Sequence, residues 1–337
     1  MSRIVFAWVC FVSVVGFARG EVDRIPELDE CGESGPAETF LMGFLGHSGS
    51  SAVMSQLYLH SDLHVPWPLE PMQKYIRSPE EGAKWTEDFF LTGKGMGLVP
   101  GFKLRPGHID ESVELWSELI RKYNTRFIRQ DRTDLLKGAI GLYSIRARFD
   151  SSAVAGLEKG EGETHCALHP EQCYFEIENV RFFAYLMHMV QDGIRQLDDF
   201  ADLLPWKCQL NVTYEEYMHD KDATMKRIFD FIGVDYQEHE SSFEKALSDN
   251  PCETVTNYQH VCAQLWGCEQ FQPFLDNEEQ GCYCLDKEHP RNAELCDVDA
   301  LIGSGTVLCQ RRQENGTMKM FACTGEEIEN KTKRRDT

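Results

Sequence analysis

Apolar residues along this chain gather in short runs, and several runs are followed by a stretch with helical spacing. An apolar run over residues 40–45 leads into a Gly/Ser turn, 46–51, and then into a helix-like stretch that continues to about residue 60. The same order returns where "NTRFIRQ" predicts a strand and "RTDLLKGAIGLYSIRARF" predicts the helix behind it. Strands that alternate with helices are typical of an α/β fold, a mostly parallel sheet with helices on both faces.

Further segments fit the same fold class. The segment "PWKCQLNVTYEEYM" predicts a strand and a turn, and "KDATMKRIFDFIGVD" predicts a helix that ends at Gly233. Apolar residues in "ESVELWSELIRKY" have the spacing of one buried helix face, and "ENVRFFAYLMHMVQDGIRQLDDFADLL" predicts a long amphipathic helix. In contrast, "KWTEDFFLTGKGMGLVPGFKLRPGHID" is loop-rich, which predicts a surface segment.

Cysteines gather toward the end of the chain. From about residue 279 the sequence is rich in cysteine, glycine and charged residues. This composition predicts a small disulfide-rich C-terminal extension, 279–325, followed by a disordered tail, 326–337. Zinc binding at Cys282-x-Cys284 is the competing interpretation, but disulfides are favoured in a secreted chain, so no metal is expected.

The N-terminus and the cysteine count indicate a secreted protein. Arg3, an apolar stretch over 4–17 and Ala18-Arg19-Gly20 predict a signal peptide, 1–20, with an uncleaved signal anchor as the alternative. Removing the peptide takes Cys10 away and leaves twelve of thirteen cysteines, an even number. The secretory pathway, either the Golgi lumen or the exterior, is therefore expected. Three sequons agree with this location, at Asn211, Asn315 and Asn330.

Charge is distributed unevenly along the 337 residues. The formal net charge of −21 argues against general nucleic-acid binding, which needs a basic surface. Between residues 94 and 148, however, eleven Lys and Arg residues stand against six Asp and Glu residues, a local balance of 11 − 6 = +5. Such a segment favours a basic groove for an anionic ligand, and a solvated mixed-charge surface is the alternative.

The turn "GHSGSS" is a candidate anion site. Backbone N–H groups at the start of a helix, with the helix dipole behind them, favour an anion. A nucleotide-triphosphate loop has the form G-x-x-x-x-G-K-[ST], but here Ser50 stands where the lysine would follow Gly49. The missing lysine argues against a P-loop kinase or NTPase. A plain strand-to-helix turn remains open on the loop alone.

Four segments together resemble the sulfotransferases that use 3′-phosphoadenosine-5′-phosphosulfate (PAPS), particularly the Golgi carbohydrate and tyrosylprotein branches. "HSGSS" is similar to the loop [RK]-x-G-[ST]-[ST], with His47 in place of the usual basic residue. "RTDLLKGAIGLY" is similar to R-x-D-x-L-x-x-A-[IV]-S-L-[WY], with Gly141 in place of the serine. "LNVTYEEYMHDKDATMKRIFDFIGVD" and "ETVTNYQHVCAQLWGC" resemble the later strand-helix segment and the closing helix. The likeness spans about residues 38 to 275 in the expected order.

The resemblance implies a P-loop-nucleotide-binding-like three-layer sandwich, a domain over 38–278, and PAPS as sulfonate donor without a metal. Amides of the 48–51 turn and two serine hydroxyls would bind its 5′ side. Arg132 fits best as the ligand of the 3′-phosphate, and Arg129 or Ser144 would replace the contact missing at Gly141. His47, or the more distant Lys245, would supply the cation near the bridging oxygen. The implied donor-binding residues are His47, Ser48, Gly49, Ser50, Ser51, Arg129, Arg132, Gly141 and Lys245.

For the catalytic base, the resemblance implies Glu70 in "HVPWPLEPMQKY", with His47 as the second catalytic residue. A glutamate that accepts a proton near neutral pH needs a raised pKa, which burial beside a group such as Trp67 would provide. His60 and His64 are the alternatives, because histidine titrates in this range. A solvated glutamate in a proline-rich turn is the competing structural interpretation.

The acceptor is implied only as a class. The resemblance implies a hydroxyl of a glycan or glycoprotein, with protein tyrosine as the second choice and a membrane only if the N-terminal segment is an uncleaved anchor. The Gly/Glu/Ser-rich insertion at 150–178 is a candidate specificity loop, and its Cys166 and Cys173 are close enough in sequence for a local disulfide. Because His47 and Gly141 depart from the family pattern, a catalytically inactive nucleotide- or glycan-binding protein stays an alternative.

Overall fold

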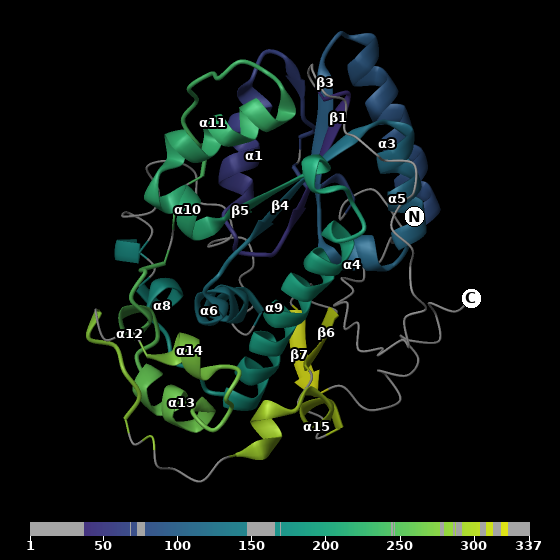
Figure 1. The fold of residues 1–337 in the computed structure, drawn as a ribbon. Helices are drawn as coiled ribbons and strands as arrows, with labels where there is room; N and C mark the ends of the chain where they lie inside the picture. Colours follow the sequence, from purple (N-terminus) through teal and green to yellow (C-terminus); the bar gives the residue numbers. More distant parts are fainter. Residues whose placement is uncertain are drawn as a thin grey trace, which may run out of the picture.

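Five parallel strands form the centre of the molecule, with β1 in the middle between β3 and β4 (Figure 1). Their order in the sheet is β2-β3-β1-β4-β5. The strands are β1 (Thr39–Phe44), β2 (Leu63–His64), β3 (Val99–Leu104), β4 (Thr125–Asp131) and β5 (Gln209–Thr213). The computed structural model describes residues 37–67, 69–72, 78–146, 166–168, 170–243, 245, 247–276, 280–285, 287, 292–303, 308–312 and 318–322.

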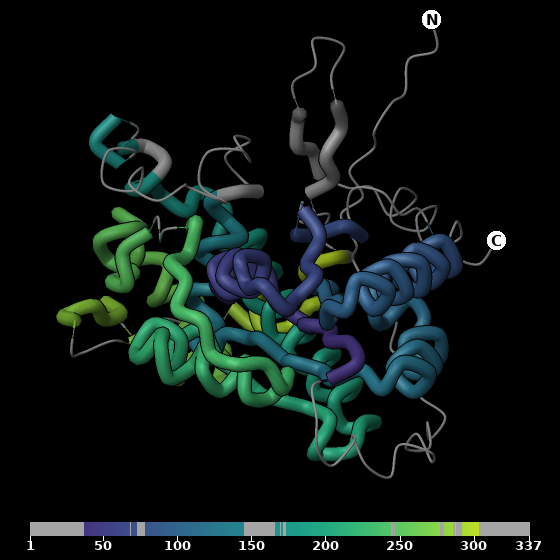
Figure 2. The backbone as a smooth tube through the Cα atoms, turned by 90° about the horizontal axis from the view of Figure 1, so that it is seen from above, coloured from purple at the N-terminus to yellow at the C-terminus, as the bar shows by residue number. Residues whose placement is uncertain are grey.

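Helices cover both faces of this sheet, which confirms the predicted three-layer α/β fold. One face carries α1 (Ser50–Leu59), α10 (Tyr214–His219) and α11 (Lys221–Ile232). The other carries α3 (Pro79–Gly95), α4 (Pro106–Asp110), α5 (Val113–Lys122), α6 (Leu135–Arg146) and α9 (Val180–Ala201). Figures 1 and 2 show α10 and α11 on one side of the molecule and α3 and α5 on the opposite side.

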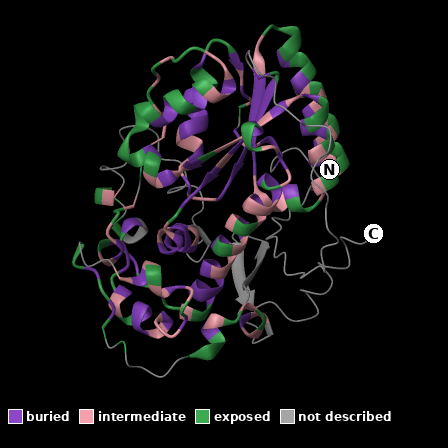
Figure 3. Cartoon of the chain, in the orientation of Figure 1, coloured by how far each residue is buried: buried purple, intermediate pink, exposed green. Residues whose placement is uncertain are grey.

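Two apolar clusters hold the layers together, because successive residues of a strand point to opposite faces. Phe40 and Met42 of β1 pack in the cluster that contains α1 and α11, whereas Leu41 packs in the cluster that contains α5 and α9. In Figure 3 the three central strands β3, β1 and β4 are mostly buried. As predicted, α11 ends at Gly233, which has a left-handed φ of 84° that glycine adopts without strain.

One region of the sheet differs from its sequence prediction. The segment expected to be a surface loop contains most of the 17-residue helix α3 and all of the inner strand β3. Pro100 and Gly101 within β3 are residues that usually interrupt strands, and they hid its pattern. Gly101 is required there, because a Cβ atom would collide with the ring of Phe40 on β1. Pro100 pairs with His64 of β2, a strand of only two residues.

Short elements occur before and after β5, the last strand of the sheet. Cys166 is bonded to Cys173, which confirms the predicted local disulfide. Three more disulfides, Cys252–Cys282, Cys262–Cys284 and Cys268–Cys296, join the segments on either side of residue 279. The short elements are α8 (Pro170–Cys173), η1 (Trp206–Cys208), α12 (Pro251–Thr254), α13 (Tyr258–Leu265), α14 (Gln272–Leu275), η3 (Ala293–Cys296), α15 (Val298–Gly303) and the antiparallel strands β6 (Leu308–Arg312) and β7 (Met318–Ala322).

Of the helices that the structure describes, none has both the length and the apolar character needed to cross a bilayer. The expected signal peptide, the tail at 326–337, and two of the three sequon asparagines, Asn315 and Asn330, lie outside the described residues. Asn211 lies on β5, an edge strand of the sheet, and is exposed.

Candidate functional site

The turn between β1 and α1 has a tightly fixed backbone. His47 and Gly49 both have left-handed φ angles, 66° and 71°. At Gly49 a Cβ atom would lie 2.8 Å from the ring of Tyr214, so glycine is required on steric grounds as well. The Nε2 atom of Gln130 on β4 donates to the Ser48 carbonyl over 2.8 Å and ties the turn to the neighbouring strand.

Ser48 differs from its predicted role. Its N–H and its hydroxyl both donate to the Leu45 carbonyl, over 3.3 and 2.7 Å, and its side chain is buried. These two bonds close the turn, so neither donor is available to a ligand. The amides that can face an anion are therefore those at the start of α1. Gly49, the residue before the helix, offers no side-chain cap to them.

A lysine reaches this helix start from a different strand. Lys103 lies near the carboxyl end of β3, and its ammonium donates to the hydroxyls of Ser50 and Ser51 over 3.2 and 2.9 Å. It is only 2% exposed and lies over the ring of Phe44, 4.4 Å from the centroid. The cation that the turn itself lacks is thus supplied by the neighbouring strand.

Glu70 lies beside this lysine. Its Oε1 is 3.2 Å from the Lys103 ammonium, and its Oε2 accepts from Nε and Nη2 of Arg105 over 2.9 and 2.8 Å. Glu70 therefore lies next to the lysine that contacts the turn. Lys103 and Arg105 join it in one ion-pair network on the β3 side of the turn.

The protonation of this network differs from the prediction. Burial alone would raise the pKa of Glu70, but the charges and hydrogen bonds of Arg105 and Lys103 bring it below its ordinary value. Trp67 does not create the expected apolar pocket, because it is 59% exposed and packs against Tyr58. Burial lowers the pKa of Lys103 to about 8. The charge of Arg105 adds to this lowering of the pKa, whereas Glu70 opposes the shift.

Arg132 lies on the other side of the turn, after the end of β4. Its Nη1 donates to the His47 carbonyl over 3.2 Å, and its guanidinium lies over the Tyr214 ring at 4.3 Å from the centroid. Glu215 lies 3.6 Å from its Nε and also accepts from the Thr133 N–H over 3.0 Å. Arg132 is therefore in direct contact with the turn.

Three other predicted residues contact partners outside the turn in the part of the chain that the structure describes. Arg129 pairs with Asp131 and with Asp198 of α9. The Ser144 hydroxyl donates to the Gly141 carbonyl within its own helix, over 2.8 Å, which removes it as a substitute ligand. Lys245 pairs with Asp249. Burial alone would raise the pKa of Asp249, but the charges of Lys245, Lys137 and Arg132 lower it below its ordinary value. This segment therefore lies within electrostatic reach of Arg132.

The two alternative bases, His60 and His64, have other partners. His60 follows the far end of α1, where its Nε2 lies 2.8 Å from the Asp235 carbonyl. His64 stacks on Phe89 with ring centroids 4.6 Å apart, and burial lowers its pKa. Neither histidine contacts the turn among the contacts that the structure describes.

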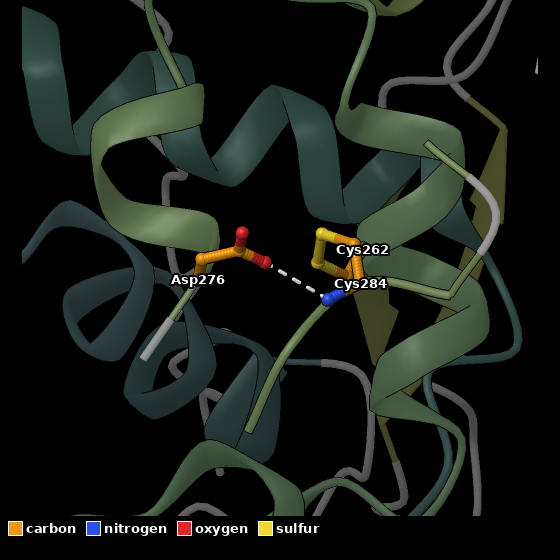
Figure 4. Close-up of side chains that lie close together, drawn as sticks. All are labelled: Cys262, Asp276 and Cys284. Atoms are coloured by element: carbon orange, nitrogen blue, oxygen red, sulfur yellow. Dashed lines mark hydrogen bonds between the residues drawn. A yellow bond between two sulfur atoms is a disulfide. The ribbon is translucent and has the colours of Figure 1, made fainter. Parts of the chain in front are cut away.

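A cysteine-aspartate cluster in the C-terminal region has the proximity of a metal site but not its chemistry. Atoms of Cys262, Asp276 and Cys284 lie within 4.8 Å of one another. The two sulfur atoms are bonded to each other, and the Asp276 carboxylate accepts from the Cys284 N–H over 2.9 Å (Figure 4). Cys282, weighed with Cys284 as a zinc pair, is bonded to Cys252 instead. Thiolate ligands are thus absent from this cluster.

Comparisons with known proteins give distant structural likenesses. The sequence matches no family model and no curated protein. A sulfotransferase from Alicyclobacillus acidocaldarius has 13% identity and a TM-score of 0.42, covering 73% of this chain and 99% of that chain. The sulfotransferase domain of a Synechococcus olefin synthase has 14% identity and a TM-score of 0.34, covering 62% and 78%. Retinol dehydratase, solved in a complex with retinol and PAP, has 11% identity and a TM-score of 0.29, covering 64% and 67%. Likeness at this level does not assign an activity.

Two charged residues of the site were not predicted from the sequence. Lys103 and Arg105 belong to the segment that was expected to be a surface loop. A single lysine near the end of the apolar run "VPGFKL" was the available indication, because a charge there needs a partner when the run is buried. Gln130 and Tyr214, which shape the turn, gave no indication in the sequence.

Proposed function

We propose that this protein transfers a sulfuryl group from PAPS to a hydroxyl group. The observation that carries the proposal is that cationic side chains flank both sides of one strand-to-helix turn. Lys103 contacts the two serines that open α1, and Arg132 contacts the carbonyl of His47 within the same turn. PAPS has anionic groups at its 5′ and 3′ positions, so a single molecule can engage both sides.

The start of α1 suits the 5′ end of this donor. Backbone amides and the helix dipole favour an anion there, and Ser50 and Ser51 add hydroxyl donors. Lys103 is held in place by these hydroxyls and by Glu70, and does not have to be recruited from solvent. Preorganised donors of this kind stabilise charge that develops on a leaving group.

The chemistry needs a proton acceptor and a cation. The acceptor oxygen attacks sulfur, the bond from sulfur to the bridging oxygen breaks, and adenosine 3′,5′-bisphosphate leaves. Glu70 accepts the proton of the attacking hydroxyl, and the Lys103 ammonium stabilises the departing phosphate oxygen. As that ammonium turns toward the phosphate, its attraction for Glu70 weakens, which raises the pKa of the carboxylate when a base is needed.

For the acceptor we propose a glycan hydroxyl, with protein tyrosine as the alternative. The proposed location is the secretory pathway. Four disulfides between described cysteines and the exposed sequon at Asn211 support an oxidising compartment. The candidate specificity insertion lies largely outside the described residues. Sulfate transfer to glycan and tyrosine acceptors distinguishes the two.

Ligand-dependent thermal stability tests the donor. Adenosine 3′,5′-bisphosphate at 100 times its dissociation constant is expected to stabilise the fold by about 2.7 kcal/mol. ATP with Mg²⁺ is the comparison ligand, because a P-loop kinase or NTPase would respond to it. A shift with ATP and none with the bisphosphate would overturn the proposal. If the bisphosphate binds, transfer of labelled sulfate from PAPS to glycan and tyrosine acceptors separates an enzyme from an inactive binding protein.

A further inference from the structure

The two departures from the family pattern, His47 and Gly141, lie against each other. A Cβ atom at Gly141 on α6 would lie 2.7 Å from Cγ and 2.8 Å from Nδ1 of the His47 ring. Contacts this short do not occur between unstrained atoms, so a larger residue at position 141 requires the ring to move. The imidazole therefore occupies the space that a serine side chain at this position of α6 would use.

Arg132 lies beside the same histidine and has an unused donor. It is 9% exposed, its Nη1 donates to the His47 carbonyl, and its buried Nε lacks a hydrogen-bond partner among the described residues. Glu215 Oε1 is 3.6 Å from that Nε, beyond a good hydrogen bond. A buried donor without a partner is rare in a native structure, and a bound anion would satisfy it.

Lys103 and Arg132 lie on opposite sides of the turn, because β1 separates β3 from β4 (Figure 1). An anion held at Ser50, Ser51 and Lys103 is thus distinct from one held at Arg132 and His47. A nucleotide that uses both places must have two separate anionic groups, as adenosine 3′,5′-bisphosphate does.

We infer that the His47 imidazole, together with Arg132, binds the 3′-phosphate and replaces the hydroxyl that Gly141 lacks. This inference rests on the proposed function. The resemblance of the loop implied that His47 serves the 5′ side of the nucleotide, whereas we assign it to the 3′ side. His47 is therefore a specificity residue for the phosphorylated ribose, and the 5′ side is served by Lys103.

Calorimetric titration of two nucleotides separates these positions. Adenosine 3′,5′-bisphosphate carries both phosphates, and AMP carries only the 5′-phosphate. His47→Gly removes the ring and keeps the left-handed backbone. Its affinity for the bisphosphate is expected to fall about ten-fold, the effect of one lost hydrogen bond to a charged group, while AMP affinity stays within about two-fold.

The failure of each claim gives a different result. If the wild-type protein binds neither nucleotide, the proposed function fails and this inference with it. If the bisphosphate binds but His47→Gly weakens both nucleotides equally, His47 serves the 5′ side and the inference is wrong. An unchanged bisphosphate affinity also overturns it, whereas the proposed function survives in both of these cases.

A second pair of variants tests the exchange between the two positions. Gly141→Ser alone is expected to weaken bisphosphate binding, because the new side chain displaces the ring. In the double variant His47→Gly, Gly141→Ser the space is open and the serine hydroxyl supplies the missing donor. The double variant should therefore bind the bisphosphate more tightly than either single variant, and weaker binding than both would contradict the inference.

Matched controls guard against a general loss of structure. Gly95→Ser adds the same side chain at a glycine with open space around its Cβ position, at the end of α3. It is expected to leave both affinities unchanged. The melting temperature of each variant without nucleotide is measured alongside. AMP affinity reports on the turn itself, so a distorted turn would lower it in Gly141→Ser and reveal misfolding.

Discussion

The two sides of the β1–α1 turn differ in how their cations are held. On the β3 side, Lys103 is buried against a carboxylate, and Arg105 completes a closed network around Glu70. On the β4 side, Arg132 contacts a backbone carbonyl, and its buried Nε has Glu215 at 3.6 Å but no hydrogen-bond partner within the described part of the chain. Charged side chains that shift the pKa of a buried lysine are typical of catalytic sites, so the β3 side fits the sulfuryl transfer step. A buried N–H that can still donate to an anion fits nucleotide binding on the β4 side. Substitutions on the β3 side should therefore lower the transfer rate, and those on the β4 side should lower nucleotide affinity.

The largest effect is expected at Lys103. Lys103→Met removes the ammonium that stabilises the leaving oxygen, and the sulfate transfer rate should fall about 1,000-fold. Lys122→Met is the matched control, because Lys122 is exposed on α5 and pairs with Glu87. Steady-state sulfate transfer measures both variants. A rate within about three-fold of wild type in Lys103→Met would remove the β3 side from the chemistry.

Glu70→Gln should have the next largest effect. The amide keeps the shape of the side chain but cannot accept a proton, so transfer should fall about 100-fold. Affinity for adenosine 3′,5′-bisphosphate should change little, because Lys103 and the start of α1 remain. Calorimetry and single-turnover rates on the same preparation separate the two quantities. Normal turnover in this variant would assign the base to another residue.

On the β4 side, Arg132→Ala should weaken bisphosphate binding by about ten- to 100-fold, as expected when a charged donor to phosphate is lost. Arg129→Ala is the comparison, because Arg129 pairs with Asp131 and Asp198 instead. It should lower the free energy of unfolding while leaving bisphosphate affinity nearly unchanged. Equal losses of affinity in the two variants would erase the distinction between them.

The smallest expected effect is a dependence on pH. Lys103 has a pKa of about 8 in the fold and 10.5 as an ordinary lysine, so the unfolded chain binds more protons between these values. The contribution of Lys103 therefore makes folding more stable as pH rises from about 8 to 10.5. Urea unfolding of the wild type and Lys103→Met across this range should show that slope only in the wild type. Identical slopes would contradict the lowered pKa.

The sequence was sufficient for the elements with simple patterns. The apolar run before the turn, the strand at β4 and the glycine-terminated helix α11 all have the periodicity of the element they form. The resemblance also implied that Arg132 binds the same nucleotide as the turn, and the structure places Arg132 in contact with the His47 carbonyl.

The rest depended on contacts between distant segments. β3 was missed because Pro100 and Gly101 interrupt its pattern, and Gly101 is explained only by the Phe40 ring on a neighbouring strand. The lowered pKa of Glu70 needs Arg105 and Lys103 nearby, which spacing alone does not reveal. The departure at Gly141 is explained only by the His47 ring, which lies against it from a segment distant in sequence.

A crystal structure of the complex with adenosine 3′,5′-bisphosphate tests the central claim most directly. The account predicts the 5′-phosphate at Ser50, Ser51 and Lys103, and the 3′-phosphate at Arg132 and His47. A nucleotide bound away from the β1–α1 turn, or bound with its two phosphates exchanged, would contradict it.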